Sequence, residues 1–415
     1  MAVSVTTSER SASAGFSTEA GSRKIWANSG DSHVQEPDGL WAERMSADMA
    51  ARMPWVEDID ERNELLHVDG KTFKQRKQWN PEVSEEELIA AGQLARGREG
   101  GMKALELFHP PGAFDTGVRL GDLDREGIWG ELIFGALGLW NGLIDDPVLY
   151  REGVRVLNDW LKETYIDVSD RCVPAATIST LAVEDAVAEV KRAAGMGFKA
   201  INLPNMLDNT ALKGWNYDVW EPLWATVEET GLVLASHIGS EAKDPEGAGF
   251  RAYHGPGGAI LNYVETAFGG QRLATMMIAS GILDRHPGLR LVISEGGASW
   301  MPAVADRMEE SYRQHGPWVR PKLSRSPTEI MKEQVYATFQ HDPSAVQVYT
   351  AMGYTNIMWG SDYPHLEGTY GHSQEILHDL FDNVDEEVRY RITRGAFLEL
   401  FPHVGEPPMS ANPRR

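Results

Sequence analysis

Short apolar runs alternate with longer amphipathic segments along most of the chain, and this alternation constrains the fold more than any other feature. Strands are predicted at residues 25–29, 128–134, 173–178, 200–204, 232–237, 289–294, 334–339 and 356–359. Helices are predicted at 147–164, 183–196, 219–230, 263–286, 300–315, 344–352, 373–381 and 386–400. Strands separated by helical crossovers form a parallel sheet, and eight such units predict a (β/α)8 TIM barrel. A doubly wound open sheet is the alternative, but no glycine-rich phosphate loop follows the first strand.

The two ends and one long segment stand apart from this alternation. Residues 1–22 are rich in Ser, Thr, Ala and Gly and lack an apolar signal region, so we expect a disordered tail. Residues 36–120 carry many charges and one amphipathic helix at 84–96, and they are predicted to be an insertion over one end of the fold. The sequence therefore predicts one barrel domain over 23–402 and a loose C-terminal tail over 403–415.

Charge and cysteine content exclude several classes of protein. The net charge of −22 argues against nucleic acid or an anionic membrane as a partner, since both need a basic surface. No run of about 18 apolar residues is present, so no membrane span is expected. The single cysteine, Cys172, excludes intramolecular disulfides and cysteine-cluster metal sites. A small-molecule substrate and a cytoplasmic location are the simplest expectations.

Carboxylates and histidines recur where the predicted strands end. Asp31 and His33 are two residues apart at the end of the first strand, so strand alternation places both on one face. His237, Glu295 and Asp362 end the fifth, sixth and eighth strands. His341 follows the seventh strand and has the weakest claim of the group. The carboxyl ends of barrel strands form the active-site rim, and such mixed ligands suit Zn²⁺, Mn²⁺ or Fe²⁺.

Each of these residues also has an ordinary structural interpretation. Asp31 can cap a turn, Asp362 can cap the following helix, and Glu295 can lie at a helix start. His33 and His237 can bond backbone carbonyls within the core. The coincidence of five or six such groups at one rim favours a metal site. The aromatic residues nearby can either line a flat apolar substrate pocket or pack in the barrel core, namely Trp300, Trp359 and Tyr363.

Five motifs, taken together in chain order, resemble the amidohydrolase-2 family. They are Asp-Ser-His-Val-Gln-Glu-Pro at 31–37, Gly-Phe-Lys-Ala-Ile-Asn-Leu-Pro at 197–204, Ser-His-Ile-Gly at 236–239, Glu-Gly-Gly-Ala-Ser-Trp-Met-Pro at 295–302 and Trp-Gly-Ser-Asp-Tyr-Pro-His at 359–365. The resemblance covers about residues 25–402. This family includes aminocarboxymuconate semialdehyde, resorcylate and carboxyvanillate decarboxylases. The resemblance implies a distorted (β/α)8 barrel and one divalent metal ion, with Zn²⁺ the first expectation.

The resemblance also assigns roles to individual residues. It implies that Asp31, His33, His237 and Asp362 are metal ligands. Glu295 stands where the decarboxylases usually have a catalytic histidine, and it can be a fifth ligand, a general base or a neutral acid. The binuclear barrel hydrolases use a lysine on the fourth strand, and no lysine occupies the inward positions here, so one metal is expected rather than two. Arg307 lies near the position of an arginine that reaches the neighbouring subunit's site, which implies a homodimer or a higher homo-oligomer.

Three functions remain open at this point. The first is non-oxidative decarboxylation of an aromatic or unsaturated carboxylic acid, with Asp362 or its neighbour His365 protonating the carbon that loses CO2. The second is hydrolysis of a lactone, ester or amide by metal-activated water, or hydration of an enoic acid, with Asp362 and Glu295 as bases. The third is a non-catalytic ligand-binding barrel. Substrate contacts are expected from a separate group of residues, namely Trp300, Arg307, His341, Trp359 and Tyr363.

Overall fold

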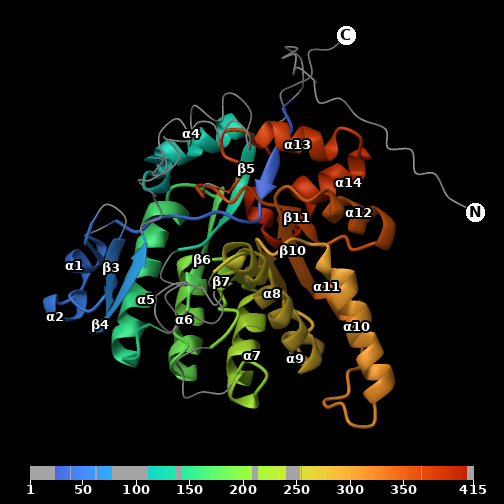
Figure 1. Ribbon diagram of the computed structural model, residues 1–415, viewed down its shortest axis with the longest axis horizontal. Coiled ribbons are helices and arrows are strands. Elements are labelled where there is room, and N and C mark those ends of the chain that lie inside the picture. Colours follow the sequence, from blue (N-terminus) through green and yellow to red (C-terminus); the bar gives the residue numbers. More distant parts are fainter. Residues whose placement is uncertain are drawn as a thin grey trace, which may run out of the picture.

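A computed structural model describes residues 24–408 except 38, 61–62, 77–110, 136–142, 208–213, 240–252, 254 and 366. The expected N-terminal tail at 1–22, the expected helix at 84–96 and residues 409–415 of the expected C-terminal tail lie outside the described residues. Within the described part, a barrel of parallel strands is surrounded by helices, with a small antiparallel sheet at its side (Figure 1).

Eight parallel strands form the barrel and confirm the predicted architecture. In spatial order they are β1 (Ala27–Ser29), β5 (Ile128–Ile133), β6 (Cys172–Thr177), β7 (Ala200–Asn202), β8 (Val233–His237), β9 (Leu291–Ser294), β10 (Val335–Phe339) and β11 (Ile357–Trp359). All residues of the six strands β6 to β11 are buried, as expected for strands covered on both faces. The first and last strands close the barrel where the amide of Gly30 donates to the carbonyl of Trp359 at 2.9 Å.

Helices surround the barrel, and several begin and end as the sequence predicts. They are α5 (Pro147–Leu161), α6 (Val183–Met196), α7 (Glu221–Thr230), α8 (Gly258–Ala279), α9 (Ile282–Arg285), α10 (Trp300–His315), α11 (Pro327–Gln334), α12 (Pro343–Met352), α13 (Ser373–Phe381), α14 (Glu386–Tyr390) and α15 (Ala396–Leu400). Gly197 and Gly231 end α6 and α7 in the left-handed conformation, which glycine adopts without strain. The helix expected at 263–286 is two helices, because the chain turns at Gly281 with φ +75°.

The base of the barrel is closed by the C-terminal segment. Phe397 of α15, Phe401 and Val404 pack against the interior residues of the strands, among them Val173, Val233 and Val292. The indole nitrogen of Trp129 donates to the carbonyl of Val404 at 3.2 Å. The barrel interior is therefore filled with apolar side chains toward this end, opposite the carboxyl ends of the strands.

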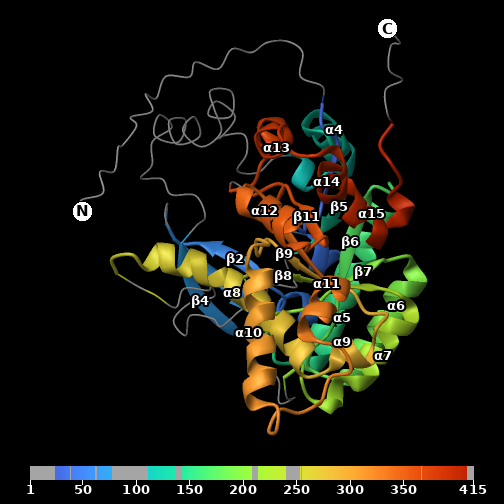
Figure 2. The same ribbon diagram turned by 90° about the vertical axis from the view of Figure 1, so that its right-hand side faces the viewer.

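The described parts of the expected insertion form two features. One is a lobe beside α5, and the other is a longer helix that leads back to the barrel. The lobe holds α1 (Leu40–Arg44), α2 (Ala47–Ala50) and an antiparallel sheet of β2 (Trp55–Asp58), β3 (Asn63–Val68) and β4 (Lys71–Arg76) (Figures 1 and 2). Lys71 ties the lobe to the barrel by donating to the carbonyl of Leu143 at 2.9 Å. The chain then returns through a short turn at Pro111–Ala113 into α4 (Thr116–Glu126), which leads directly to β5. None of the helices in the described ranges combines the length and the apolar character needed to cross a membrane.

Candidate metal centre

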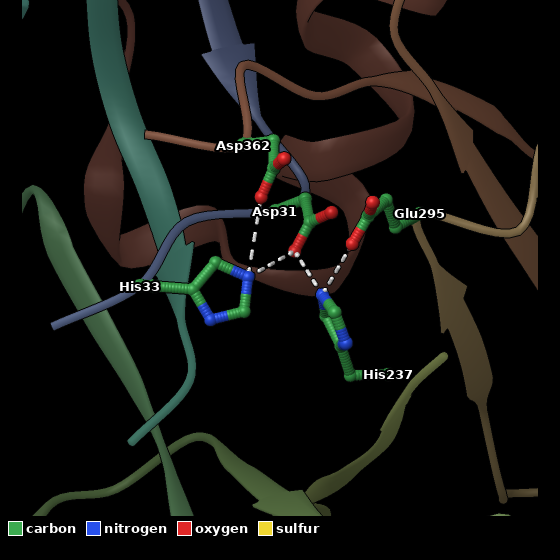
Figure 3. A group of neighbouring side chains, drawn as sticks. All are labelled: Asp31, His33, His237, Glu295 and Asp362. Carbon is green, nitrogen blue, oxygen red and sulfur yellow. Dashed lines mark ion pairs between the residues drawn. The ribbon is translucent and has the colours of Figure 1, made fainter. Parts of the chain in front are cut away.

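Five side chains converge at the carboxyl ends of four strands (Figure 3). One ligand atom from each residue lies within 4.8 Å of the others, in the set Asp31, His33, His237, Glu295 and Asp362. Nε2 of His33 is 3.2 Å from a carboxylate oxygen of Asp362, and Nε2 of His237 is 3.0 Å from one of Glu295. Oδ1 of Asp31 lies between the two imidazoles, 3.7 Å from His33 and 3.4 Å from His237. The cluster thus joins Asp31 and its near neighbour His33 to three residues that lie far away in the sequence.

The closing seam between β1 and β11 positions three members of this cluster. The amide of Asp362 donates to the carbonyl of Asp31 at 3.0 Å, and the amide of His33 donates to the carbonyl of Tyr363 at 2.6 Å. Below them, the hydroxyl of Ser29 accepts from the amide of Ser361 at 2.8 Å and donates to the carbonyl of Asp31 at 2.5 Å. The backbone spacing of the ligands is therefore fixed by the same hydrogen bonds that close the barrel.

His237 and Glu295 are positioned from β8 and β9 on the other side. Nδ1 of His237 is 2.7 Å from the carbonyl of Ile238, so Nδ1 carries the proton and Nε2 faces the carboxylates. The side-chain amide of Asn205 donates to the carbonyl of His237 at 3.0 Å. The amide of Glu295 donates to the hydroxyl of Thr338 at 2.8 Å, which fixes the point where β9 ends.

Two members of the cluster have strained backbones. Glu295 has φ +60° and Asp362 has φ +55°, and Asp69 is the one further non-glycine residue with positive φ in the described ranges. Side chains with a Cβ rarely adopt this conformation, which costs on the order of 1–3 kcal/mol. Such strain concentrates at functional sites, because it aims a side chain that a relaxed strand end would direct elsewhere. Glu295 and Asp362 are both turned into the cluster in this way (Figure 3).

Burial and mutual charge shift the protonation of the cluster. Burial raises the pKa of Asp31 above its ordinary value and lowers the pKa of His33 well below its own. Burial, together with the charge of Asp362, raises the pKa of Glu295 to about 7. Burial opposes protonation of His237, but the carboxylates of Asp31 and Glu295 outweigh it and raise the pKa of His237 well above its ordinary value. Three carboxylates, from Asp31, Glu295 and Asp362, have oxygens within 4.8 Å of one another, and such a cluster attracts a cation.

The chemistry of the donor set fits one divalent metal ion. Both carboxylate oxygens of Asp31 and Oδ2 of Asp362 are buried and accept no hydrogen bond of normal geometry within the described part of the chain. Buried carboxylate oxygens are costly to leave without a partner, and a cation is the partner that this arrangement suits. Two imidazole nitrogens and three carboxylates match the ligands of Zn²⁺, Mn²⁺ and Fe²⁺.

His365 lies beside the cluster and is bonded to one of its members. Its Nδ1 is 2.8 Å from Oδ1 of Asp362, and its ring stacks on His33 with 4.0 Å between the ring centroids. Burial opposes its protonation, but the carboxylate of Asp362 outweighs burial and raises the pKa of His365 to about 9. A pKa of about 9 keeps His365 protonated at neutral pH beside the cluster, and its side chain is 37% exposed.

Comparison with known proteins identifies the family. The amidohydrolase family model matches residues 138–402, which is more than half of the chain. The chain belongs to this family. A decarboxylase of Aspergillus niger, yanB, is 22% identical to this amidohydrolase over 199 residues, which are 46% of this chain and 52% of that protein. The amidohydrolase thus matches only about half the length of that curated relative.

Two solved structures share the fold across nearly the whole chain. An amidohydrolase from Mycobacterium avium subsp. paratuberculosis superposes with a TM-score of 0.70 at 18% identity, covering 92% of this chain and 98% of that one. A 5-carboxyvanillate decarboxylase from Novosphingobium aromaticivorans, solved with bound manganese and a nitrobenzoic acid ligand, gives a TM-score of 0.59 at 16% identity, covering 91% and 97%. These structures are similar to this amidohydrolase in fold.

The residues expected to contact substrate lie in different surroundings. Trp359 is buried in the core, and the indole of Trp300 donates to the carbonyl of Gly297 at 2.8 Å. The hydroxyl of Tyr363 donates to Asp122 at 2.8 Å, so it faces α4. His341 is exposed, with Nε2 3.4 Å from the carbonyl of Glu367. Arg307 pairs with Glu310 on α10, with 81% of its side chain exposed, and does not reach the cluster of its own chain.

Several residues that hold the cluster in place are absent from the sequence predictions. Asn205, Ser29 and Thr338 act through hydrogen bonds to backbone groups, and nothing in a single sequence distinguishes them from ordinary loop and strand residues. Glu131 is different, because it is a carboxylate inside the apolar run Ile-Trp-Gly-Glu-Leu-Ile-Phe at 128–134. A charge in such a run signals a buried partner, which the structure identifies as Arg119.

Proposed function

We propose that this amidohydrolase is a metal-dependent decarboxylase that removes CO2, without oxidation, from an aromatic or unsaturated carboxylic acid. The observation that carries the proposal is the contact between Nδ1 of His365 and Oδ1 of Asp362 at 2.8 Å, because Asp362 is itself a member of the cation cluster. The pair places a proton where a substrate bound at the cluster needs one. The decarboxylases among its relatives support the same reaction class.

The ligand roles follow from the geometry of the cluster. Asp31, His33, His237 and Asp362 would hold one divalent ion, with Glu295 able to serve as a fifth ligand. The ion would supply Lewis acidity and a template for the substrate's carboxylate and an adjacent oxygen. Zn²⁺ is the ion we propose, since its coordination suits mixed nitrogen and oxygen ligands. Mn²⁺ and Fe²⁺ are the alternatives, and manganese is bound in a structural relative.

The residues then supply the proton transfer. As the carbon–carbon bond breaks, its electron pair stays on the ring or alkene carbon, and CO2 leaves. That carbon takes a proton from the Asp362–His365 pair, and the partly exposed His365 regains one from solvent. Positioned general acids of this kind contribute about 10²- to 10⁴-fold to a rate.

Hydrolysis is the second candidate, and Glu295 is the observation that favours it. A third carboxylate in the cluster makes the site more negative, which suits a neutral lactone, ester or amide better than an anionic acid. Glu295, with its pKa raised to about 7, is also suited to accept a proton from attacking water. Hydration of an enoic acid would use the same two carboxylates, Glu295 and Asp362.

We propose further properties of this protein. A homodimer or higher homo-oligomer is supported by Arg307, whose exposed side chain on α10 is available to another subunit. We propose that segment 36–120 is an insertion that covers the mouth of one barrel domain, residues 23–402, and supplies substrate specificity. Trp300, Trp359, Tyr363 and His341 are proposed to shape the substrate site. A cytoplasmic location is also proposed, as is a small-molecule substrate.

A substrate panel tests the two reactions against each other. Metal-replete protein is incubated with aryl and enoic acids and, separately, with lactones, esters and amides. Decarboxylation predicts CO2 release from at least one acid, with one solvent deuterium incorporated at the product carbon in D2O. Heavy-oxygen label from water appearing in the product instead identifies hydrolysis. No CO2 release from any acid would overturn the decarboxylase proposal.

A further inference from the structure

A fully buried ion pair lies behind the metal centre and takes no part in binding the ion. Arg119 of α4 and Glu131 of β5 form two parallel hydrogen bonds, Nε to Oε1 at 2.5 Å and Nη2 to Oε2 at 2.9 Å. Both side chains are completely inaccessible to solvent. Burying such a pair costs desolvation energy, and well-packed apolar side chains often give equal or greater stability. Stability alone is therefore a poor explanation for this pair.

Two further contacts of Arg119 lead to the segments on both sides of the seam. Its Nη1 donates to the backbone carbonyl of His33 at 2.9 Å. Its guanidinium lies over the ring of Tyr363, 4.7 Å from the centroid, and Tyr363 directly follows Asp362. One buried cation thus contacts the β1 segment and the β11 segment at once, while Glu131 fixes its orientation.

A second residue of the same helix is hydrogen-bonded to the segment that follows β11. Asp122, one turn after Arg119 on α4, accepts a hydrogen bond from the hydroxyl of Tyr363 at 2.8 Å. Gly112 packs against this junction, and a side chain there would collide with Tyr363 and Asp122. Helix α4 is therefore tightly packed against Tyr363 and the segment that follows β11. We call Arg119, Glu131, Asp122 and Tyr363 the α4 clamp.

We propose that Arg119, oriented by Glu131, is a positioning residue that sets the separation of His33 and Asp362 and thereby the affinity of the centre for its ion. The inference rests on the metal centre proposed above. His33 and Asp362 approach to 3.2 Å, a distance at which two groups can share one small cation. Groups that orient metal ligands from behind typically change metal affinity about 10- to 100-fold when they are removed.

The test compares metal affinity with folding stability. The main variant is Arg119→Met with Glu131→Met, which removes both charges and leaves neither buried alone. Arg119→Lys keeps the charge beside Glu131 but cannot make all three of Arg119's contacts. Arg192→Met is the matched control, because Arg192 joins α6 to Asp159 of α5 through a partly buried ion pair. Dissociation constants for Zn²⁺ and Mn²⁺ are measured by competition with a chromogenic chelator, and Tm is measured on metal-free protein.

The expected results separate positioning from stability. The double Met variant should bind Zn²⁺ about 10- to 100-fold more weakly than wild type, with Arg119→Lys intermediate. Arg192→Met should lower Tm and leave the dissociation constant unchanged. A double variant whose Tm falls but whose metal affinity equals wild type would overturn the inference, since the clamp would then serve stability alone.

Two further measurements keep the test decisive. If the double variant does not fold, Tyr363→Phe removes only the hydroxyl bond to Asp122, and we expect several-fold weaker metal binding. Unchanged affinity in both Tyr363→Phe and Arg119→Lys would overturn the inference as well. Wild-type protein that binds no divalent ion, or binds it as tightly as Asp31→Asn, would instead refute the metal centre itself.

Discussion

The two halves of the metal centre are held in place by different means. One half lies on the seam where β1 meets β11 and consists of Asp31, His33 and Asp362. The buried pair of Arg119 and Glu131 contacts this half through the carbonyl of His33. His237 and Glu295 lie at the ends of β8 and β9, and neutral hydrogen bonds between side chains and backbone groups hold them. A continuous strand pair fixes its ends by itself, whereas the seam of a barrel needs additional support. The difference indicates that the geometry of the seam half depends on packing against α4, whereas that of the other half follows from the strand ends.

Removing one ligand from either half is expected to have the largest effect. Asp31→Asn in the seam half and His237→Ala in the other should each lower metal content from about one ion per chain to near zero. Activity should fall about 10³-fold or more, since all metal-dependent chemistry is lost. Metal analysis by mass spectrometry and steady-state kinetics measure both effects. His378→Gln is the control, because His378 bonds Asp382 on α13 and should change neither. Full metal content in either ligand variant would contradict the shared centre.

The proton donor is expected to belong to the seam half. His365→Gln should lower kcat about 10²-fold at saturating metal, because it removes the proton held beside Asp362. The alkaline limb of the pH–rate profile, expected near the His365 pKa of about 9, should disappear in the variant. Rates measured between pH 6 and pH 10 give both results. Retention of that limb would assign the proton to another group.

The pH dependence of metal binding is expected to come from residues of both halves. A group whose pKa is raised keeps its proton to higher pH, and that proton must leave when a cation binds. Glu295 and His237 have raised pKa values, and so does Asp31 in the seam half. The lowered pKa of His33 means that this imidazole is already neutral. Metal affinity should therefore rise with pH through about 7, roughly tenfold per pH unit for each released proton.

Glu295→Gln sharpens this expectation, because the variant has no carboxyl proton to release. Calorimetry in two buffers of different ionisation enthalpy counts the protons lost on Zn²⁺ binding. The variant should release fewer protons than wild type at pH 6.5. An equal count would show that Glu295 is already ionised in the metal-free protein.

Backbone strain is expected to be present in both halves and to give the smallest effect. At Glu295 and Asp362, the Gly variant should be more stable than the Ala variant by about 1 kcal/mol, because positive φ suits glycine. Each pair lacks the carboxylate equally, so the comparison isolates the backbone. Chemical denaturation of metal-free protein measures it. A more stable Ala variant at either position would show that the strain is relieved when the carboxylate is gone.

The sequence predicts the barrel well, because its strands are apolar runs separated by helices with clear ends. It also places Asp31, His33, His237, Glu295 and Asp362 at strand ends, and the carboxyl ends of parallel strands must meet at one rim. Their individual roles stay predictions. Some parts of the fold are not predicted from the sequence, among them helices α1, α2, α4 and α11 and the sheet of β2–β4.

Contacts between distant segments could not be predicted from one sequence. Tyr363 reads as an aromatic at the mouth of the site, yet its hydroxyl is bonded to Asp122, more than 200 positions earlier in the chain. In the sequence, Arg119 is one of the many charges of the expected insertion 36–120. Only tertiary packing shows that it is buried against His33, because helix periodicity does not distinguish a buried arginine from a solvated one.

The apolar residues that close the base of the barrel have a consequence for access to the cluster. Phe397, Phe401 and Val404 pack against the interior residues of the strands, so the barrel axis is filled at that end. An ion or a substrate must therefore reach the cluster from the rim at the carboxyl ends of the strands.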